Sequence, residues 1–166
     1  NWEAWVAIED VLESTKYFGD NIRVVVIGAG QKFDEYKANY PSVSFSGRIP
    51  HRDAIELLKK MDICICPYST QLIAKNKSYR KVLEYLGAGK PIVISNAESR
   101  EKFLKENENA LLYKAGDPED LAEKVKAILN DERLYFRMSY NNLELAKQFS
   151  WKEVIKRSGV IKILQY

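Results

Sequence analysis

Residues 78–95 read SYRKVLEYLGAGKPIVIS, and this stretch decides the fold. Apolar residues at helical spacing predict a short helix from about Tyr79 to Ala88, and the glycines that follow end it. The apolar run Pro91–Ile94 then predicts a buried strand. A polar loop, Tyr68–Lys81, joins this helix to a strand that ends at Cys66. Ligands of open α/β sheets bind beyond the carboxyl ends of the strands, so we expect a binding site at this loop.

The rest of the chain alternates between strand and helix in the same way. Residues 22–27 read IRVVVI, a nearly continuous β-branched run that is typical of a parallel strand covered on both faces. The periodicity predicts further strands at Val43–Ser46, Asp62–Cys66 and Ala110–Tyr113, and helices at about residues 5–12, 31–39, 52–61 and 99–106. This order predicts an α/β fold, with a Rossmann-like parallel sheet and helices on both faces.

The C-terminal third predicts a helical extension. Asp117 and Pro118 supply an N-cap and a proline in the first turn of a helix whose buried stripe continues to Leu129. A second helix is expected at about residues 132–148. Ser150-Trp151-Lys152-Glu153 has the form of a capping box, which predicts the start of a third helix.

Length and composition limit the class of protein. With 166 residues the chain has the size of one domain, and nothing in it resembles a linker. Lys and Arg number 26 against 23 Asp and Glu, and these charges are scattered, which argues against nucleic acid as the main partner. The chain lacks an apolar run of the roughly 18 to 20 residues that a membrane helix needs, and its beginning does not resemble a signal peptide. We expect a soluble, cytoplasmic domain.

The two cysteines are expected to be structural. Cys64 and Cys66 alternate along one strand and point to the same face, so they are poorly placed to bridge each other. A metal site would need further Cys or His ligands, and the single histidine, His51, cannot complete such a set. We therefore predict buried thiols and no metal site.

The turn Gly28-Ala29-Gly30 leaves three interpretations open. It follows a buried strand and precedes a helix, as in a dinucleotide-binding fingerprint, but Phe33 occupies the position of the third glycine. Glycine is also what a tight strand-to-helix turn needs for its backbone angles. The interpretation that fits better is a glycine turn beside a ligand, where a phosphate or a sugar can approach the backbone.

Glu84 is the acidic residue of the 79–88 helix, whose other residues are largely apolar. A carboxylate at the inner edge of such a helix needs a partner, and the two hydroxyls of a ribose would engage both of its oxygens. The alternative is a surface glutamate that pairs with Arg80 or Lys81 on its own helix.

Positive residues gather at the start of the same helix. They are Lys75, Lys77, Arg80 and Lys81. Such a run is commonly a solvated face, but here it coincides with a helix N-terminus at the strand ends, where N–H groups and cations can bind a diphosphate. His51 follows the turn Gly47-Arg48-Ile49-Pro50. It could act as a base, but the sequence favours a simple helix start, because no nucleophile or orienting acid is evident beside it.

Six segments together carry a resemblance to a known family. They read VVIGAG at residues 25–30, VSFSGRI at 43–49, MDICICP at 61–67, KVLEYLGAGKPIV at 81–93, ENALLY at 108–113 and FSW at 149–151. In this order and spacing they resemble the C-terminal, donor-binding half of a group 1 family glycosyltransferase with the GT-B architecture. The resemblance covers nearly the whole chain.

The resemblance implies a role for each candidate residue. Glu84 would hold the ribose of a nucleoside-diphosphate sugar, and the helix start Ser78-Tyr79-Arg80-Lys81 would lie by the diphosphate. Arg48 and Ile49 would lie against the nucleobase, and Gly28 and Gly30 would line the cleft. The implied reaction transfers a sugar to an acceptor with retention of anomeric configuration, and it needs no metal or other cofactor.

Two departures from the family pattern bear on activity. Many members have a second glutamate eight positions before the one that binds ribose, and this chain has Asn76 there, although Ser78–Lys81 resembles a branch that also lacks the acid. In the family, the Arg and Lys that neutralise the leaving diphosphate follow a first strand that we do not find here. The acceptor-binding half is also missing. The protein could associate peripherally with a membrane through that half. We expect the isolated chain to be inactive.

Two other functions remain as alternatives. A dinucleotide-binding oxidoreductase would hold its cofactor at Gly28 to Gly30, and a non-catalytic βα interaction module would bind no nucleotide. The sequence does not distinguish UDP from GDP as the nucleotide of the donor.

Overall fold

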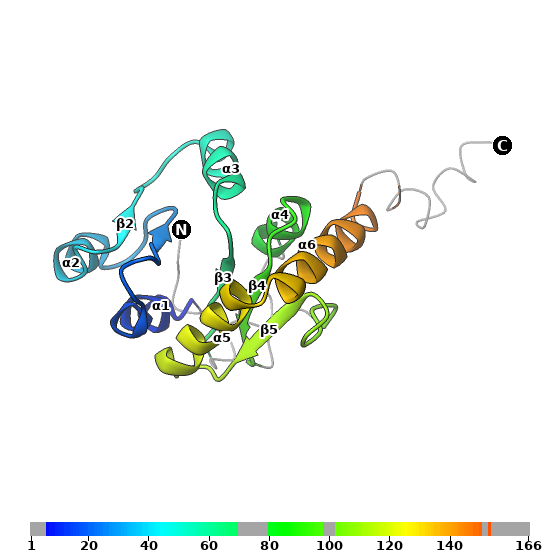
Figure 1. Cartoon of the computed structure of the whole chain (residues 1–166). Helices are drawn as coiled ribbons and strands as arrows, with labels where there is room; N and C mark the ends of the chain where they lie inside the picture. The colour runs from blue at the N-terminus through cyan, green and yellow to red at the C-terminus, as the bar shows by residue number, and fades with distance from the viewer. Residues whose placement is uncertain (1–5, 70–79, 98–101, 151–152, 154–166) are drawn as a thin grey trace.

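The computed structural model describes residues 6–69, 80–97, 102–150 and 153. Helices and parallel strands alternate along this part of the chain, and two long helices close it (Figure 1). The predicted α/β class is confirmed. The strands run parallel in two sheets, with β1 (Val25–Val26) beside β2 (Ser44–Phe45) in one of them. The other has the order β3-β4-β5, formed by Cys64–Cys66, Ile92–Ser95 and Ala110–Tyr113.

The described strands form two separate sheets, whereas the sequence predicts one continuous sheet. Within the described residues, no ladder joins β1 to β3, and the IRVVVI run forms a strand of only two residues. Val26 is buried, but Val24 and Val25 are only half-buried. A β-branched run forms an extended strand only where a neighbouring strand pairs with it, and β1 has one on a single side.

Six α-helices and one short 3-10 helix fall within the described residues. They are α1 (Ile8–Ser14), the 3-10 helix η1 (Thr15–Tyr17), α2 (Phe33–Asn39), α3 (His51–Lys59), α4 (Arg80–Gly87), α5 (Pro118–Asn130) and α6 (Glu132–Lys147). Asp117 caps α5 as predicted, since its side chain accepts a hydrogen bond from the Asp120 N–H. The third C-terminal helix lies largely outside the described residues, but Glu153 N–H does donate to the Ser150 hydroxyl at 3.4 Å.

The prediction of a helix at residues 99–106 is wrong for residues 102–106, the part that the structure describes. Residues 102–106, the second half of the expected 99–106 helix, are not helical: Lys102 and Phe103 form a turn, and Glu106 forms an isolated bridge with Ala110. The Asn109 side chain accepts from the Lys105 N–H at 2.7 Å and donates to the Phe103 carbonyl at 3.2 Å. An asparagine side chain that bonds nearby backbone groups competes with helix formation, and here the turn is the outcome.

β4 is the centre of the core and has helices on both of its faces. Its four residues are almost wholly buried. Val93 packs with Leu121 and Val125 of α5, whereas Ile92 and Ile94 pack on the opposite side with Val82 and Leu86 of α4. Cys64 and Cys66 are buried, as predicted, and neither forms a disulfide bond; burial raises the pKa of the Cys64 thiol.

Candidate functional site

Helix α4 carries the candidate ligand residue Glu84 at the border of the core. Val82 and Leu86 of the same helix are fully buried, whereas the Glu84 side chain keeps 25% of its surface exposed. The helix ends at Gly87, and just beyond it Gly89 has φ +64° and an N–H that donates to the Leu86 carbonyl at 2.9 Å. A glycine in this left-handed conformation is a common helix stop, as the glycine turn of the sequence indicates.

Helix α6 fixes the end of α4. The two helices lie side by side (Figure 1), and a Cβ added to Gly89 would lie 2.9 Å from Leu143 Cγ of α6. The Ser139 hydroxyl donates to the Gly89 carbonyl at 2.6 Å, and the Asn142 side chain donates to the Lys90 carbonyl at 2.8 Å. Helix α4 is therefore held by its C-terminal end, and Glu84 sits on a rigid support.

The carboxylate of Glu84 meets a residue from another helix. His51, the first residue of α3, places its Nε2 atom 2.9 Å from Glu84 Oε1. The imidazole is well exposed, at 69%. The predicted helix start at His51 is confirmed, but sequence reasoning missed its contact with Glu84. The two residues are 33 positions apart, and no local pattern signals the contact.

The glycine turn after β1 lies against the turn after β2. Gly28 has φ +115°, and its N–H donates to the Ser46 hydroxyl at 3.1 Å. Gly28 also forms an isolated bridge with Gly47, the residue directly before Arg48 and Ile49. Arg48 is exposed and Ile49 is half-buried. Three of the predicted site segments, at Gly28 to Gly30, at Arg48 and Ile49, and at Glu84, thus follow successive strands β1, β2 and β3.

Phe33 takes a structural role at the glycine turn. It begins α2 and packs edge-on against Phe45 of β2, with ring centroids 5.9 Å apart. The ring fills the space between this helix and its sheet, where a dinucleotide fingerprint would have a glycine for close packing. This contact does not favour the oxidoreductase alternative.

A buried serine ties down the beginning of the loop that leads to α4. Ser95, at the end of β4, accepts from the Tyr68 N–H at 3.0 Å and donates to the Tyr68 carbonyl at 2.9 Å. Both residues are almost completely buried. This pair joins the segment after β3 to the neighbouring strand, so it sets where the loop leaves the sheet.

Part of the predicted diphosphate site lies outside the described residues. Ser78, Tyr79 and Asn76 belong to that part, as do Lys75 and Lys77. Arg80 is exposed at the first described position of α4, and Lys81 follows it, half-buried. The structure therefore shows two of the predicted cations one turn before Glu84.

The described residues show neither a metal-ligand cluster nor a membrane-spanning helix. They contain no group of three or more His, Cys, Asp or Glu side chains that could hold a metal ion. No helix among them is both long enough and apolar enough to cross a bilayer.

Comparison with known proteins identifies the family. The family model for group 1 glycosyl transferases matches residues 3–145, which is most of the chain. The chain belongs to the group 1 glycosyltransferase family. This confirms the resemblance carried by the six sequence segments. It also confirms the prediction of a protein of a glycosyltransferase family, and it favours neither alternative function.

Curated relatives are longer than this chain. The N,N'-diacetylbacillosaminyl-diphospho-undecaprenol alpha-1,3-N-acetylgalactosaminyltransferase of Campylobacter jejuni is 25% identical over 159 residues, which are 90% of this chain and 39% of that protein. An uncharacterised glycosyltransferase of Methanocaldococcus jannaschii is 23% identical over 162 residues, or 96% and 42% of the two chains. The chain thus spans about two fifths of their length.

Solved structures share the fold. The Anabaena protein HepE in complex with UDP-glucose superposes with a TM-score of 0.79 at 15% identity, over 100% of this chain and 47% of HepE. The C-terminal domain of the group 1 family protein LpcC from Francisella tularensis superposes with a TM-score of 0.74 at 16% identity, over 89% and 80% of the two chains. Both likenesses confirm the GT-B type of domain.

Proposed function

We propose that this chain is the donor-binding part of an enzyme that transfers a sugar from a nucleoside-diphosphate sugar to an acceptor. The observation that carries the proposal is Glu84, a partly buried carboxylate held on α4 beside His51, one turn after Arg80 and Lys81. The Glu84 carboxylate can accept two hydrogen bonds from the hydroxyls of a ribose, and the cationic start of the same helix can bind the diphosphate that follows the ribose. The complex of the structural relative HepE with UDP-glucose supports the same ligand class.

The other predicted residues take their roles around this centre. Glu84 binds the ribose, and Ser78, Tyr79, Arg80 and Lys81 bind the diphosphate. Arg48 and Ile49 lie against the nucleobase, and Gly28 and Gly30 line the cleft. The contact between the Gly28 turn and the Gly47 turn supports a single pocket wall at the ends of β1 and β2.

The chemistry proposed is transfer with retention of configuration. Negative charge builds up on the diphosphate as it departs, so cations and helix N–H groups that face it stabilise the transition state. Here Arg80 and Lys81 supply part of that charge. We further propose that the complete site needs an acceptor-binding half, that this half carries any peripheral membrane contact, and that the enzyme acts in the cytoplasm. The isolated chain is then expected to bind nucleotide weakly and to turn over little or no donor.

Isothermal titration calorimetry of the chain with UDP, GDP, ADP and NADH tests the proposal. We expect heat from UDP or GDP that saturates, and none from NADH under the same conditions. Binding of NADH alone would favour the oxidoreductase, and no binding of any nucleotide would favour the interaction module. Appreciable sugar transfer by the isolated chain would contradict the proposal that an acceptor-binding half is required.

A further inference from the structure

Three of the five large apolar side chains that the described residues expose lie on α6. They are Phe136, Tyr140 and Leu143, with 60%, 63% and 44% of their surface exposed. Spacings of four and three residues place all three on one face of the helix. Single apolar residues are common on protein surfaces, but a contiguous row of them indicates a surface that contacts another molecule.

The opposite side of α6 is already packed. Leu134 and Met138 are buried in the core against α5, and α4 also contacts the helix (Figure 1). A helix that is apolar on two opposite sides needs a partner on each of them. Within the described part of the chain, the exposure of Phe136 and Tyr140 shows that no element covers their side.

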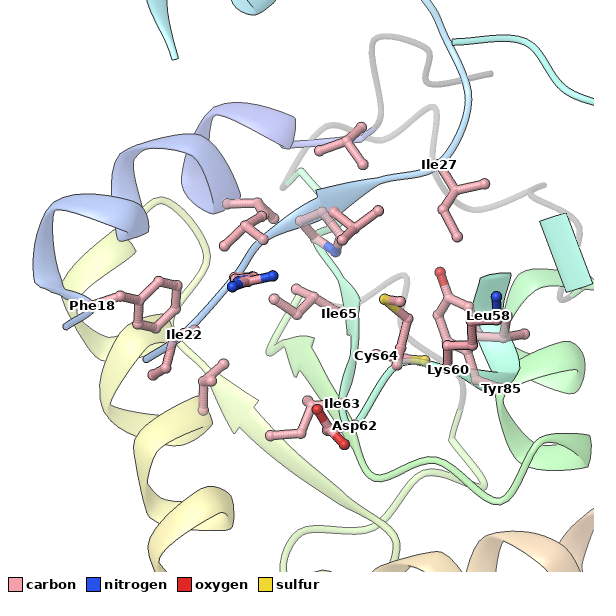
Figure 2. A pocket seen from close by; sticks show the side chains of 18 of the residues that line it. Phe18, Ile22, Ile27, Leu58, Lys60, Asp62, Ile63, Cys64, Ile65 and Tyr85 are labelled. Carbon is pink, nitrogen blue, oxygen red and sulfur yellow. The ribbon is translucent and has the colours of Figure 1, made fainter. Parts of the chain in front are cut away.

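The row on α6 is separate from the cavity of about 510 Å³ that lies beside residues 22–27 and 62–65. Figure 2 shows Ile22 and Ile63 around this cavity, and none of the described residues that line it belongs to α6. Leu129, another of the five exposed apolar residues, belongs to the cavity wall. An occupant of the cavity therefore leaves the row on α6 exposed.

Charged residues lie at both ends of the row. Glu132 begins α6 and Lys147 ends it, and both are exposed. Their spacing places them on the same face as the row, and we call these two residues with Phe136, Tyr140 and Leu143 the outer face of α6. An acid at the start and a base at the end also suit the helix dipole, so the apolar row between them is what indicates a partner.

The outer face is symmetric about the midpoint of α6, which falls just before Tyr140. Phe136 and Leu143 lie equally far from this point along the chain, and so do the terminal residues. A two-fold axis there sets Phe136 of one copy against Leu143 of an antiparallel second copy. It also sets Glu132 against Lys147, so opposite charges meet at both ends of the helix pair.

The charges around the outer face fit a second copy better than they fit a lipid surface. Arg133, Arg137 and Lys147 are exposed on α6, but so are Glu132 and Glu144. Helices that bind anionic membranes are rich in Lys and Arg on their polar face, without an equal share of acids. A two-fold helix pair uses both signs of charge.

We propose that the outer face of α6 binds the outer face of α6 in a second copy of this chain, as an antiparallel helix pair around a two-fold axis. The helix has 16 residues and is about 24 Å long, so one helix pair forms an interface at the small end of the known range, and the dimer is transient. The inference does not depend on the proposed function, because no nucleotide takes part in it.

Sedimentation equilibrium without nucleotide, from about 10 μM to 1 mM protein, tests the proposal. We expect the native chain to form a dimer whose share rises with concentration. Phe136→Ser removes a ring from both sides of the interface and should weaken association at least about tenfold. Tyr17→Ser, at the exposed Tyr17 of η1, is the matched control and should associate as the native chain does. If Phe136→Ser does not fold, Tyr140→Ser takes its place.

Charge reversal tests the antiparallel arrangement. Glu132→Lys or Lys147→Glu alone brings like charges together at both ends of the pair, and each should weaken association by roughly fivefold. An equimolar mixture of these two variants restores opposite charges at both ends, as does the double variant, and both should associate as the native chain does. Glu123→Lys, at an exposed position of α5, changes the net charge as Glu132→Lys does and should leave association unchanged.

Four results would overturn the proposal. The first is a native chain that stays monomeric over the whole concentration range. The second is a Phe136→Ser variant that associates as tightly as the native chain. The third is a mixture of the two charge variants that associates no better than either alone. The fourth is a native chain that binds phosphatidylglycerol vesicles through Phe136 and stays monomeric in solution, which would make a lipid surface the partner.

Discussion

His51 Nε2 lies 2.9 Å from Glu84 Oε1, and this contact joins the first residue of α3 to the middle of α4. It connects the segments that follow β2 and β3, which are separated in sequence and lie in different sheets. The well-exposed imidazole engages one carboxylate oxygen. A ribose that binds Glu84 must therefore displace His51 or share the carboxylate with it.

Removal of the Glu84 carboxylate is expected to weaken nucleotide binding selectively. We predict that Glu84→Gln loses about 1–3 kcal/mol of affinity for the nucleotide that binds the native chain, because a charged hydrogen-bond acceptor is lost. Calorimetry measures this change. Glu56→Gln on α3, where the exposed Glu56 pairs with Lys59, is the control and should bind as the native chain does. Equal affinities of Glu84→Gln and the native chain would remove Glu84 from the site.

His51 is expected to position the Glu84 carboxylate. We predict that His51→Ala changes the stability of the free protein by less than about 1 kcal/mol, because the exposed imidazole contributes little there. Nucleotide affinity should fall by less than in Glu84→Gln. The double variant should lose less than the sum of the two single losses, because the residues act through one contact. Strict additivity in this cycle, measured by calorimetry, would show that the two act independently.

Ser95 is expected to support the site from the core. Ser95→Ala removes both hydrogen bonds between the Ser95 hydroxyl and the buried Tyr68 backbone, so we predict a loss of about 1–3 kcal/mol in stability. The variant should also bind nucleotide less tightly, since Tyr68 begins the loop that leads to α4. Ser14→Ala, which loses one hydrogen bond to the Val11 carbonyl in α1, is the control for stability alone. Urea denaturation and calorimetry on both variants separate the two effects.

Local patterns in the sequence predict most of the elements near the site. The helix Arg80–Gly87, the strand Ile92–Ser95 and the strand Ala110–Tyr113 lie within two residues of their predicted bounds. In these elements propensity, burial and turn residues agree, so a short window of sequence is enough.

The features that sequence reasoning missed depend on distant neighbours. Among the described residues the IRVVVI run pairs with a strand on one side only, so it is a strand of two residues, and no property of the run itself reports this. Residues 102–106 are not helical because the Asn109 side chain, beyond the expected helix, bonds to Lys105 and Phe103. The partner of Glu84 comes from 33 positions away. Tertiary contacts decide each of these cases.

The hydrogen bond between Tyr40 and Glu13 predicts a loss of stability in alkali. The Tyr40 hydroxyl donates to the Glu13 carboxylate, and this bond, with partial burial, raises the pKa of Tyr40 from 10.0 to about 12. The folded state binds the phenolic proton more tightly than the unfolded state, so this contribution to stability is present below pH 10 and is lost between pH 10 and 12. Tm should fall less over that range in Tyr40→Phe than in the native chain. Tyr17→Phe, at an exposed site, should behave as the native chain.

Substitution of Gly89 tests whether the chain needs a residue in the left-handed conformation directly after α4. Its φ is +64°, and a Cβ there would lie 2.9 Å from Leu143 Cγ, so we predict that Gly89→Ala loses about 1–2 kcal/mol of stability. Gly87→Ala is the matched control in the same helix end, where an added Cβ meets nothing within 4 Å, and it should be neutral or slightly stabilising. Adding Leu143→Ala to Gly89→Ala removes the side-chain contact but not the backbone strain, so it should not restore native stability. Urea denaturation measures the stability of the native chain, the two single glycine variants and the double variant. Equal stabilities of Gly89→Ala and Gly87→Ala would show that α4 can end without this conformation.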